Sequence, residues 1–216
     1  MKGMLKKDFS LMKGQKQFFL VAFIFAFVFL FVNRMVTFGV SYLMIMFLMF
    51  TLSTITYDEY DNGYSFLFTL PISRRLYVKE KYVFCMLTTT VVGVVNSLLI
   101  LLLSIWKENQ VALPDLLLSC TSALAAGMVL MAILIPVQLK FGSEKRQLAM
   151  LIGFVGVFLL IFLGSWIMDR FQLPKFMKVV EAMPMAVIAG LGLAVVVLAI
   201  VISYLISVRI MEKKEF

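Results

Sequence analysis

The side chains that could do chemistry in this sequence are few. The 216 residues contain no histidine and two cysteines, Cys85 and Cys120, both of which lie in apolar runs. Metal sites built on histidine and Ser-His or Cys-His nucleophile pairs are therefore excluded. We expect the two cysteines to be small buried thiols and not a disulfide.

One carboxylate cluster stands out, because Asp58, Glu59 and Asp61 occupy three of four consecutive positions. Paired carboxylates can act as general acid and base, but here no histidine is available as a partner. A phosphate-binding loop of the form Gly-x-x-x-x-Gly-Lys-Ser/Thr is also missing, since no glycine is followed directly by lysine. We therefore expect no catalytic, cofactor or metal site in this chain, which is not an enzyme by itself. If ATP and Mg²⁺ drive its action, a separate subunit binds them.

The elements that carry these residues are predicted to be membrane helices. Hydrophobic residues make up 62% of the chain and charged residues 15%, against about 45–50% and about 25% in soluble domains. We predict an all-α integral membrane protein with one transmembrane domain over residues 1–216, because a helix needs about 20 apolar residues to cross a bilayer. The six predicted spans are residues 18–32, 36–56, 83–106, 116–139, 148–168 and 185–208.

Lysine and arginine are distributed unequally between the two sides of these spans. Most of the 20 basic residues lie in the N-terminal tail, residues 57–82, residues 140–147 and the C-terminal tail. This bias predicts that both termini are cytoplasmic, so the net charge of +8 reports topology and requires no nucleic-acid partner. No charged residue falls inside a predicted span, and the chain thus lacks the mid-membrane charge that ion-coupled transporters use.

Residues 1–17 are predicted to form an amphipathic interfacial helix. Met1, Leu5, Phe9 and Met12 repeat along one face, and lysines populate the flanks. Such a helix lies in the plane of the membrane surface and is held by anionic headgroups. The sequence leaves open whether it is a fixed anchor or a moving part.

The longest predicted cytoplasmic loop, residues 57–82, carries the most information. After the acidic cluster comes an apolar run over residues 64–70, which Pro71 ends, and Ser73 is the expected N-cap of a helix that leads into the third span. The apolar run could lie on lipid headgroups. Alternatively, it could dock on a cytosolic partner, with aromatic anchors in a pocket and a charged rim.

The residues that carry a family resemblance are Glu59, Gly63, Phe66, Leu67, Thr69, Leu70, Pro71, Ser73, Arg74, Arg75 and Lys81. Their order resembles the permease subunits of type-2 ABC transporters, and so do the N-terminal helix and the six-span plan. The resemblance implies that residues 57–82 hold a coupling helix that docks in a cleft of an ABC ATPase subunit. It also implies a dimer with a second permease copy or a related permease, and an extracellular hairpin at residues 169–184.

Two sets of candidate site residues follow. The expected ATPase-docking residues are Asp58, Glu59, Asp61, Tyr64, Phe66, Leu67, Phe68, Arg74 and Arg75, with the apolar ones as anchors and the charged ones nearer the rim. Asn96 is the most polar residue deep in a predicted span. It could line a substrate path or form a hydrogen bond between helices.

The function that fits these observations is the permease subunit of an ATP-driven exporter in a bacterial plasma membrane. Spans rich in Phe and Met with almost no charge suit an amphipathic substrate. The resemblance implies export of amphipathic peptides, or resistance to antimicrobial ones. A secondary transporter or channel is one alternative, and an integral membrane scaffold or enzyme is another. Co-purification with an ATPase would separate these hypotheses.

Overall fold

The computed structural model of the chain is almost entirely helical over the residues that it describes. It describes residues 1–31, 36–60, 63–106, 113–142, 151–152, 155–156, 158–159, 162–163, 166 and 185–214. The helices are α1 (Lys2–Gly14), α2 (Lys16–Phe31), α3 (Val36–Glu59), α4 (Gly63–Leu67), α5 (Arg74–Trp106), α6 (Leu113–Phe141) and α9 (Met185–Lys213). No strand occurs in these ranges, which confirms the all-α prediction.

Four helices contain segments long and apolar enough to cross a membrane by themselves. These segments are Ser41–Glu59, Arg74–Leu99, Thr121–Phe141 and Gly190–Lys213. A fifth candidate is α1 and α2 taken together, although the two helices are bent by 66° relative to each other. The chain is thus a multi-pass membrane protein. The predicted span 148–168 falls mostly outside the described residues, and the predicted hairpin 169–184 falls entirely outside them.

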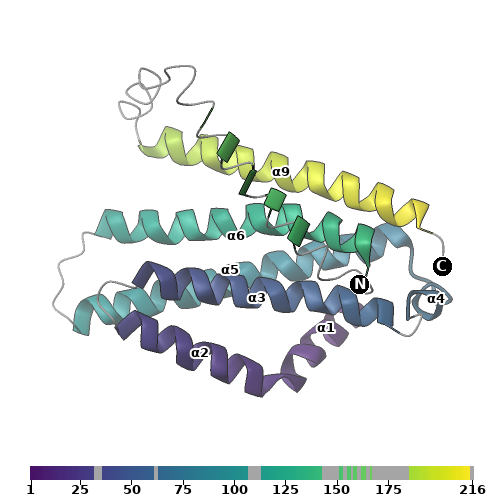
Figure 1. Cartoon of the computed structure of the whole chain (residues 1–216), viewed down its shortest axis with the longest axis horizontal. Coiled ribbons are helices and arrows are strands. Elements are labelled where there is room, and N and C mark those ends of the chain that lie inside the picture. Colours follow the sequence, from purple (N-terminus) through teal and green to yellow (C-terminus); the bar gives the residue numbers. More distant parts are fainter. Residues whose placement is uncertain are drawn as a thin grey trace.

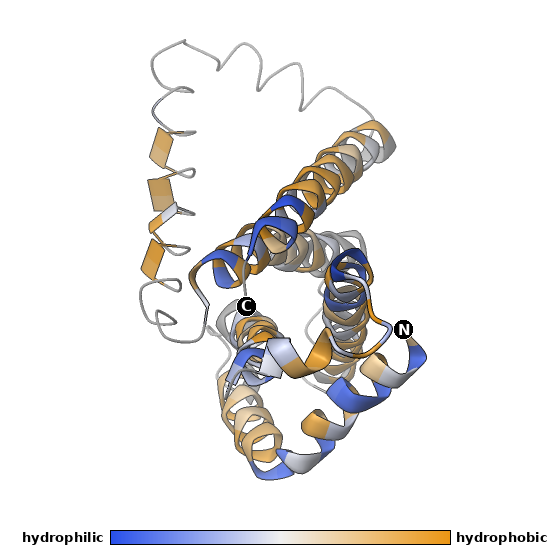
Figure 2. Cartoon of the chain, turned by 90° about the vertical axis from the view of Figure 1, so that its right-hand side faces the viewer, coloured by the Kyte–Doolittle hydropathy of each residue, from blue (hydrophilic) through white to orange (hydrophobic). Residues whose placement is uncertain are grey.

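The long helices run along the long axis of the molecule, and both termini lie at one end of it, close to α4 (Figure 1). Hydrophilic residues gather at this end, on α1 and on the last turns of α9 (Figure 2). We call it the polar end. Because both termini lie at this end, the arrangement agrees with an even number of spans. That the polar end is cytoplasmic remains a prediction.

The bend between α1 and α2 turns the N-terminal helix across the polar end. Gly14 is the last residue of α1, and the backbone N–H of Gln15 donates to the carbonyl oxygen of Met12 at 3.2 Å. Glycine disfavours continuation of a helix, and the sequence changes there from lysine-rich to almost purely apolar. This change in composition separates α1, a surface helix, from α2, a membrane helix.

The main core lies where α3, α5, α6 and α9 converge toward the polar end. Its fully or almost fully buried side chains include Ile55, Tyr77, Met131, Leu139 and Met211. Polar bonds reinforce the packing, because the Tyr82 hydroxyl on α5 lies within hydrogen-bond distance of Ser203 and Ser207 on α9, at 2.5 and 2.8 Å. The polar end is therefore a tightly packed support for the elements placed on it.

Candidate functional site

The short helix α4 and the turn after it form the element predicted to dock on a partner. Gly63 opens α4, and a Cβ at this position would come within 2.5 Å of the carbonyl oxygen of Asp58, so the close approach requires glycine. At the other end, Ser73 Oγ accepts a hydrogen bond from the backbone N–H of Leu76 at 3.2 Å. This bond confirms Ser73 as the N-cap of α5, which continues from Arg74 into the membrane as one helix.

The four predicted aromatic and aliphatic anchors have different environments. Phe66 is 72% exposed, whereas Tyr64 is 2% exposed and belongs to the main core. Leu67 and Phe68 are half-buried and pack against that core. In this structure Tyr64, Leu67 and Phe68 therefore hold α4 on the bundle, and Phe66 is the anchor that faces outward, with Leu70 also exposed.

The contacts of Tyr64 explain why α4 is fixed in place. Its ring meets the Tyr77 ring edge to face with centroids 5.6 Å apart, and the two hydroxyls are 3.4 Å apart. Phe68 adds a second edge contact to Tyr77 and lies beneath the guanidinium of Arg74, 5.9 Å from its ring centre. Burial raises the pKa of Tyr64 above its usual value, so this phenol stays neutral and acts as a packing group.

The charged residues predicted to form the rim tie the start of α5 and the end of α3 to the C-terminal end of α9. Arg74 donates to the carbonyl oxygen of Glu212 at 2.6 Å, and Arg75 Nε lies 2.6 Å from the Glu212 carboxylate. Cations near a helix C-terminus satisfy its free carbonyl groups and its dipole. Glu59 pairs with Lys214 at 2.6 Å. Asp61 lies outside the described residues.

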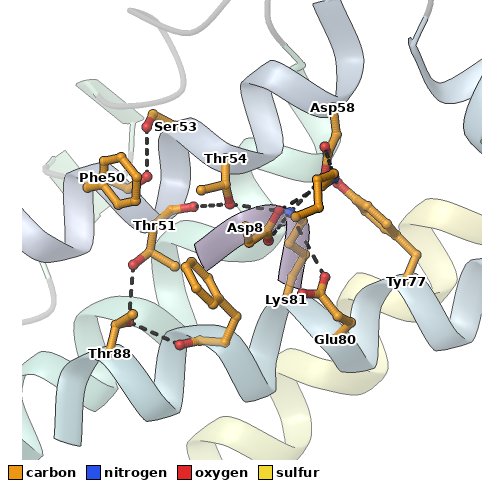
Figure 3. A network of polar contacts seen from close by, with 12 residues as sticks. Asp8, Phe50, Thr51, Ser53, Thr54, Asp58, Tyr77, Glu80, Lys81 and Thr88 are labelled. Atoms are coloured by element: carbon orange, nitrogen blue, oxygen red, sulfur yellow. Dashed lines mark hydrogen bonds and ion pairs between the residues drawn. The ribbon is translucent and has the colours of Figure 1, made fainter. Parts of the chain in front are cut away.

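A buried ionic cluster, which the sequence analysis did not predict, joins side chains from three helices (Figure 3). It joins Asp8 of α1, Asp58 of α3, and Glu80 and Lys81 of α5. The ammonium of Lys81 donates to Asp8 at 2.5 Å and to Thr54 at 3.2 Å, and it pairs with Asp58 at 2.7 Å. The side chains of Asp8, Glu80 and Lys81 are fully buried.

Lys7 completes this cluster from its outer side, because its ammonium pairs with both Asp8 and Asp58. Tyr77 links the cluster to α4, since its hydroxyl donates to Asp58 at 3.2 Å while its ring supports Tyr64. A continuous set of contacts thus runs from α4 through Tyr77 and Asp58 to Lys81 and Asp8. Three helices, α1, α3 and α5, meet at one ammonium group.

The cluster changes the interpretation of the N-terminal helix. The helix itself is present, but its buried residues are Met4 and Asp8, while Met1 and Phe9 of the predicted apolar face are exposed. The ion pair of Asp8 with Lys81 sets the side of α1 that packs on the bundle, and the sequence did not predict this contact. Contact of the exposed side with lipid headgroups stays a prediction.

Sequence reasoning missed Asp8 and Glu80 as members of a site, and it noted Lys81 only as part of a motif. One signal was available, because Asp8 is the single acidic residue among the many lysines of residues 1–17. Asn96 is buried in α5, and its place on a substrate path remains a prediction.

Metal-binding groups and cysteines are the remaining candidates for chemistry in this chain. Among the described residues, no group of three His, Cys, Asp or Glu side chains could hold a metal ion. Cys85 is a buried free thiol, as predicted, and the side chain of Cys120 is outside the described set.

Comparison with known proteins gives one match. The family described as ABC-2 family transporter protein matches residues 3–212, nearly the whole chain. Among the curated proteins and among the solved structures, nothing matches this chain. The matched range includes all of α1 except Lys2, the whole of α4 and every member of the ionic cluster.

Proposed function

The chain belongs to the ABC-2 transporter family, and from this premise we propose that it is the permease subunit of an exporter powered by a separate ATPase docked on α4. Membership makes the chain the membrane subunit of an ABC transporter. The observation that carries the proposal is Phe66, a 72% exposed aromatic side chain on a helix that is otherwise fixed to the core.

Docking on α4 is supported by the chemistry of its exposed surface. Phe66 and Leu70 are apolar and exposed at the polar end, and Arg75 in the first turn of α5 has a side chain that is 73% exposed. Interface hot spots combine a buried aromatic anchor with a polar rim and typically cost about 2 kcal/mol or more when truncated. A pocket on the ATPase subunit that receives Phe66 fits this pattern. The ATP and Mg²⁺ are bound by that subunit.

The ionic cluster and its neighbours connect α4 to the helices of the membrane domain. Tyr64 and Tyr77 join α4 to α5, and Asp58 at the end of α3 pairs with Lys81 of α5. The same ammonium holds Asp8 of α1. A displacement of α4 by the ATPase would therefore act on α1, α3 and α5 together, because separating any one of them leaves a buried charge without its partner.

The partners and the substrate follow from the remaining surface. Large apolar side chains are exposed along α2 and α9, among them Leu20, Leu193 and Leu198. These faces suit the lipid bilayer and a second permease copy or a related permease. The polar end is cytoplasmic in this proposal, in a bacterial plasma membrane. The transported substrate is an amphipathic molecule, with an amphipathic or antimicrobial peptide as the first candidate.

The experiment that tests the proposal is purification of the tagged chain from its native membrane. We expect an ABC ATPase subunit to co-purify, and we expect amphipathic peptides to stimulate ATP hydrolysis by the complex in liposomes. Recovery of the chain without any ATPase would contradict the proposed coupling. ATPase activity that no amphipathic peptide changes would contradict the proposed substrate class.

A further inference from the structure

A groove of about 730 Å³ lies between α6 and α9 at the polar end. One wall is formed by Val137, Lys140 and Phe141 of α6, and the other by Ile206, Ile210 and Lys213 of α9, while Ile152 of the predicted span 148–168 also lines the groove. None of these residues belongs to α4 or to the ionic cluster, although the groove borders the proposed docking element at Lys214, which pairs with Glu59 and lies over the Tyr64 ring.

Both walls change from apolar to basic in the same direction. On α9, Ile206, Ile210 and Lys213 follow one another at helical spacing, so they form one stripe whose lysine is nearest the end of the helix. On α6, Val137 is followed one turn later by Lys140 and Phe141 at the end of that helix. The groove is therefore apolar along its length and positively charged at its outer end.

Both lysines lie at the ends of long apolar helices. Lys140 and Lys213 are the basic residues in the last turns of α6 and α9, so we expect their ammonium groups at the headgroup level of a bilayer that these helices span. Both side chains are exposed. Among the described residues, neither has a salt-bridge partner, while the nearby Glu212 is taken by Arg75. Lys214, which also borders the groove, pairs with Glu59.

We propose that this groove binds an anionic phospholipid of the leaflet at the polar end. The phosphate lies between Lys140 and Lys213, and an acyl chain lies along Val137, Ile206 and Ile210. Basic pockets between transmembrane helices select anionic headgroups in this way. The apolar walls distinguish a lipid from a soluble anion, which would leave them uncovered.

The test compares lipid binding by the full-length chain in detergent, measured by native mass spectrometry. The probes are dioleoylphosphatidylglycerol and the zwitterionic dioleoylphosphatidylcholine. In the variant K140Q/K213Q, affinity for phosphatidylglycerol should fall about 30-fold, which corresponds to about 2 kcal/mol at about 1 kcal/mol for each lysine near a membrane surface. Phosphatidylcholine binding should be unchanged.

Two controls make the result specific. The variant K79Q removes one charge from an exposed lysine of α5 at the same end that does not line the groove and should keep phosphatidylglycerol affinity, as should K140R/K213R, which keeps the charge. A loss in K79Q as large per removed charge as in K140Q/K213Q, or no loss in either, would overturn the site. Full competition by millimolar glycerol phosphate would overturn the lipid assignment, because it would show that the headgroup alone suffices.

Discussion

The substitution Lys81→Met tests the buried ionic cluster. Lys81 is fully buried and lies 2.5 Å from Asp8 and 2.7 Å from Asp58. Methionine fills much of the same volume but leaves Asp8, Asp58 and Glu80 with Lys7 as the remaining cation of the cluster. Removing one partner of a buried ion pair costs about 3–5 kcal/mol, because the other charge stays buried without compensation. We expect a loss of that size in the free energy of unfolding.

The matched control is Arg75→Met. Arg75 also forms an ion pair at 2.6 Å, with Glu212, but its side chain is 73% exposed. Exposed pairs contribute about 0–1 kcal/mol, so this variant should lose little. The comparison contrasts a buried cation that pairs with Asp8 and Asp58 with an exposed cation that pairs with Glu212, at the same end of the bundle.

Two measurements would check this prediction. The free energy of unfolding can be measured by SDS titration in mixed micelles, and hydrogen exchange reports whether α1 stays on the bundle. In Lys81→Met the amides of α1 should exchange faster than in wild type, and adding Asp8→Asn should recover part of the lost stability, because it removes one uncompensated charge. Equal stability of Lys81→Met and Arg75→Met would refute the reasoning.

Three further predictions follow from other features. Gly63→Ala should destabilise the chain by about 1–3 kcal/mol, because its Cβ would press on the Asp58 carbonyl; proteolysis of residues 60–73 should become faster. The purified chain alone should neither bind nor hydrolyse ATP, as fluorescent nucleotide titration would show, because it has no phosphate-binding loop. Cysteines placed at Lys145 and Lys213 should be labelled only from the cytoplasm and one at Lys178 only from outside; the reverse pattern would contradict the six-span topology.

The helices and the cap of α5 could be predicted from the sequence. Long apolar runs predicted α3, α5, α6 and α9, because a membrane helix depends mainly on local hydrophobicity. Ser73 was predicted as a cap from the residues around it, and the Leu76 hydrogen bond confirms it. Features that depend on a few neighbouring residues are readable in this way.

Contacts between residues far apart in the chain could not be predicted from the sequence. Asp8 and Lys81 are 73 positions apart, and no periodic pattern connects them. The apolar spacing of residues 1–17 therefore predicted a membrane-surface helix and gave no sign of the side of α1 that packs on the bundle. In α4 the helix has five residues, too few for a repeat to show which of Tyr64 and Phe66 faces the core. Tertiary packing decides that choice.

The most direct test of the account is recovery of the ABC ATPase by the purified permease and its Phe66→Ala variant. Phe66 is 72% exposed and lies on α4, and the matched control Phe25→Ala removes a ring that is 53% exposed from α2. Loss of a buried aromatic anchor costs about 2 kcal/mol or more. We therefore predict that Phe66→Ala recovers less than a tenth of the ATPase, while Phe25→Ala and wild type recover equal amounts. Equal recovery by all three would contradict docking on α4.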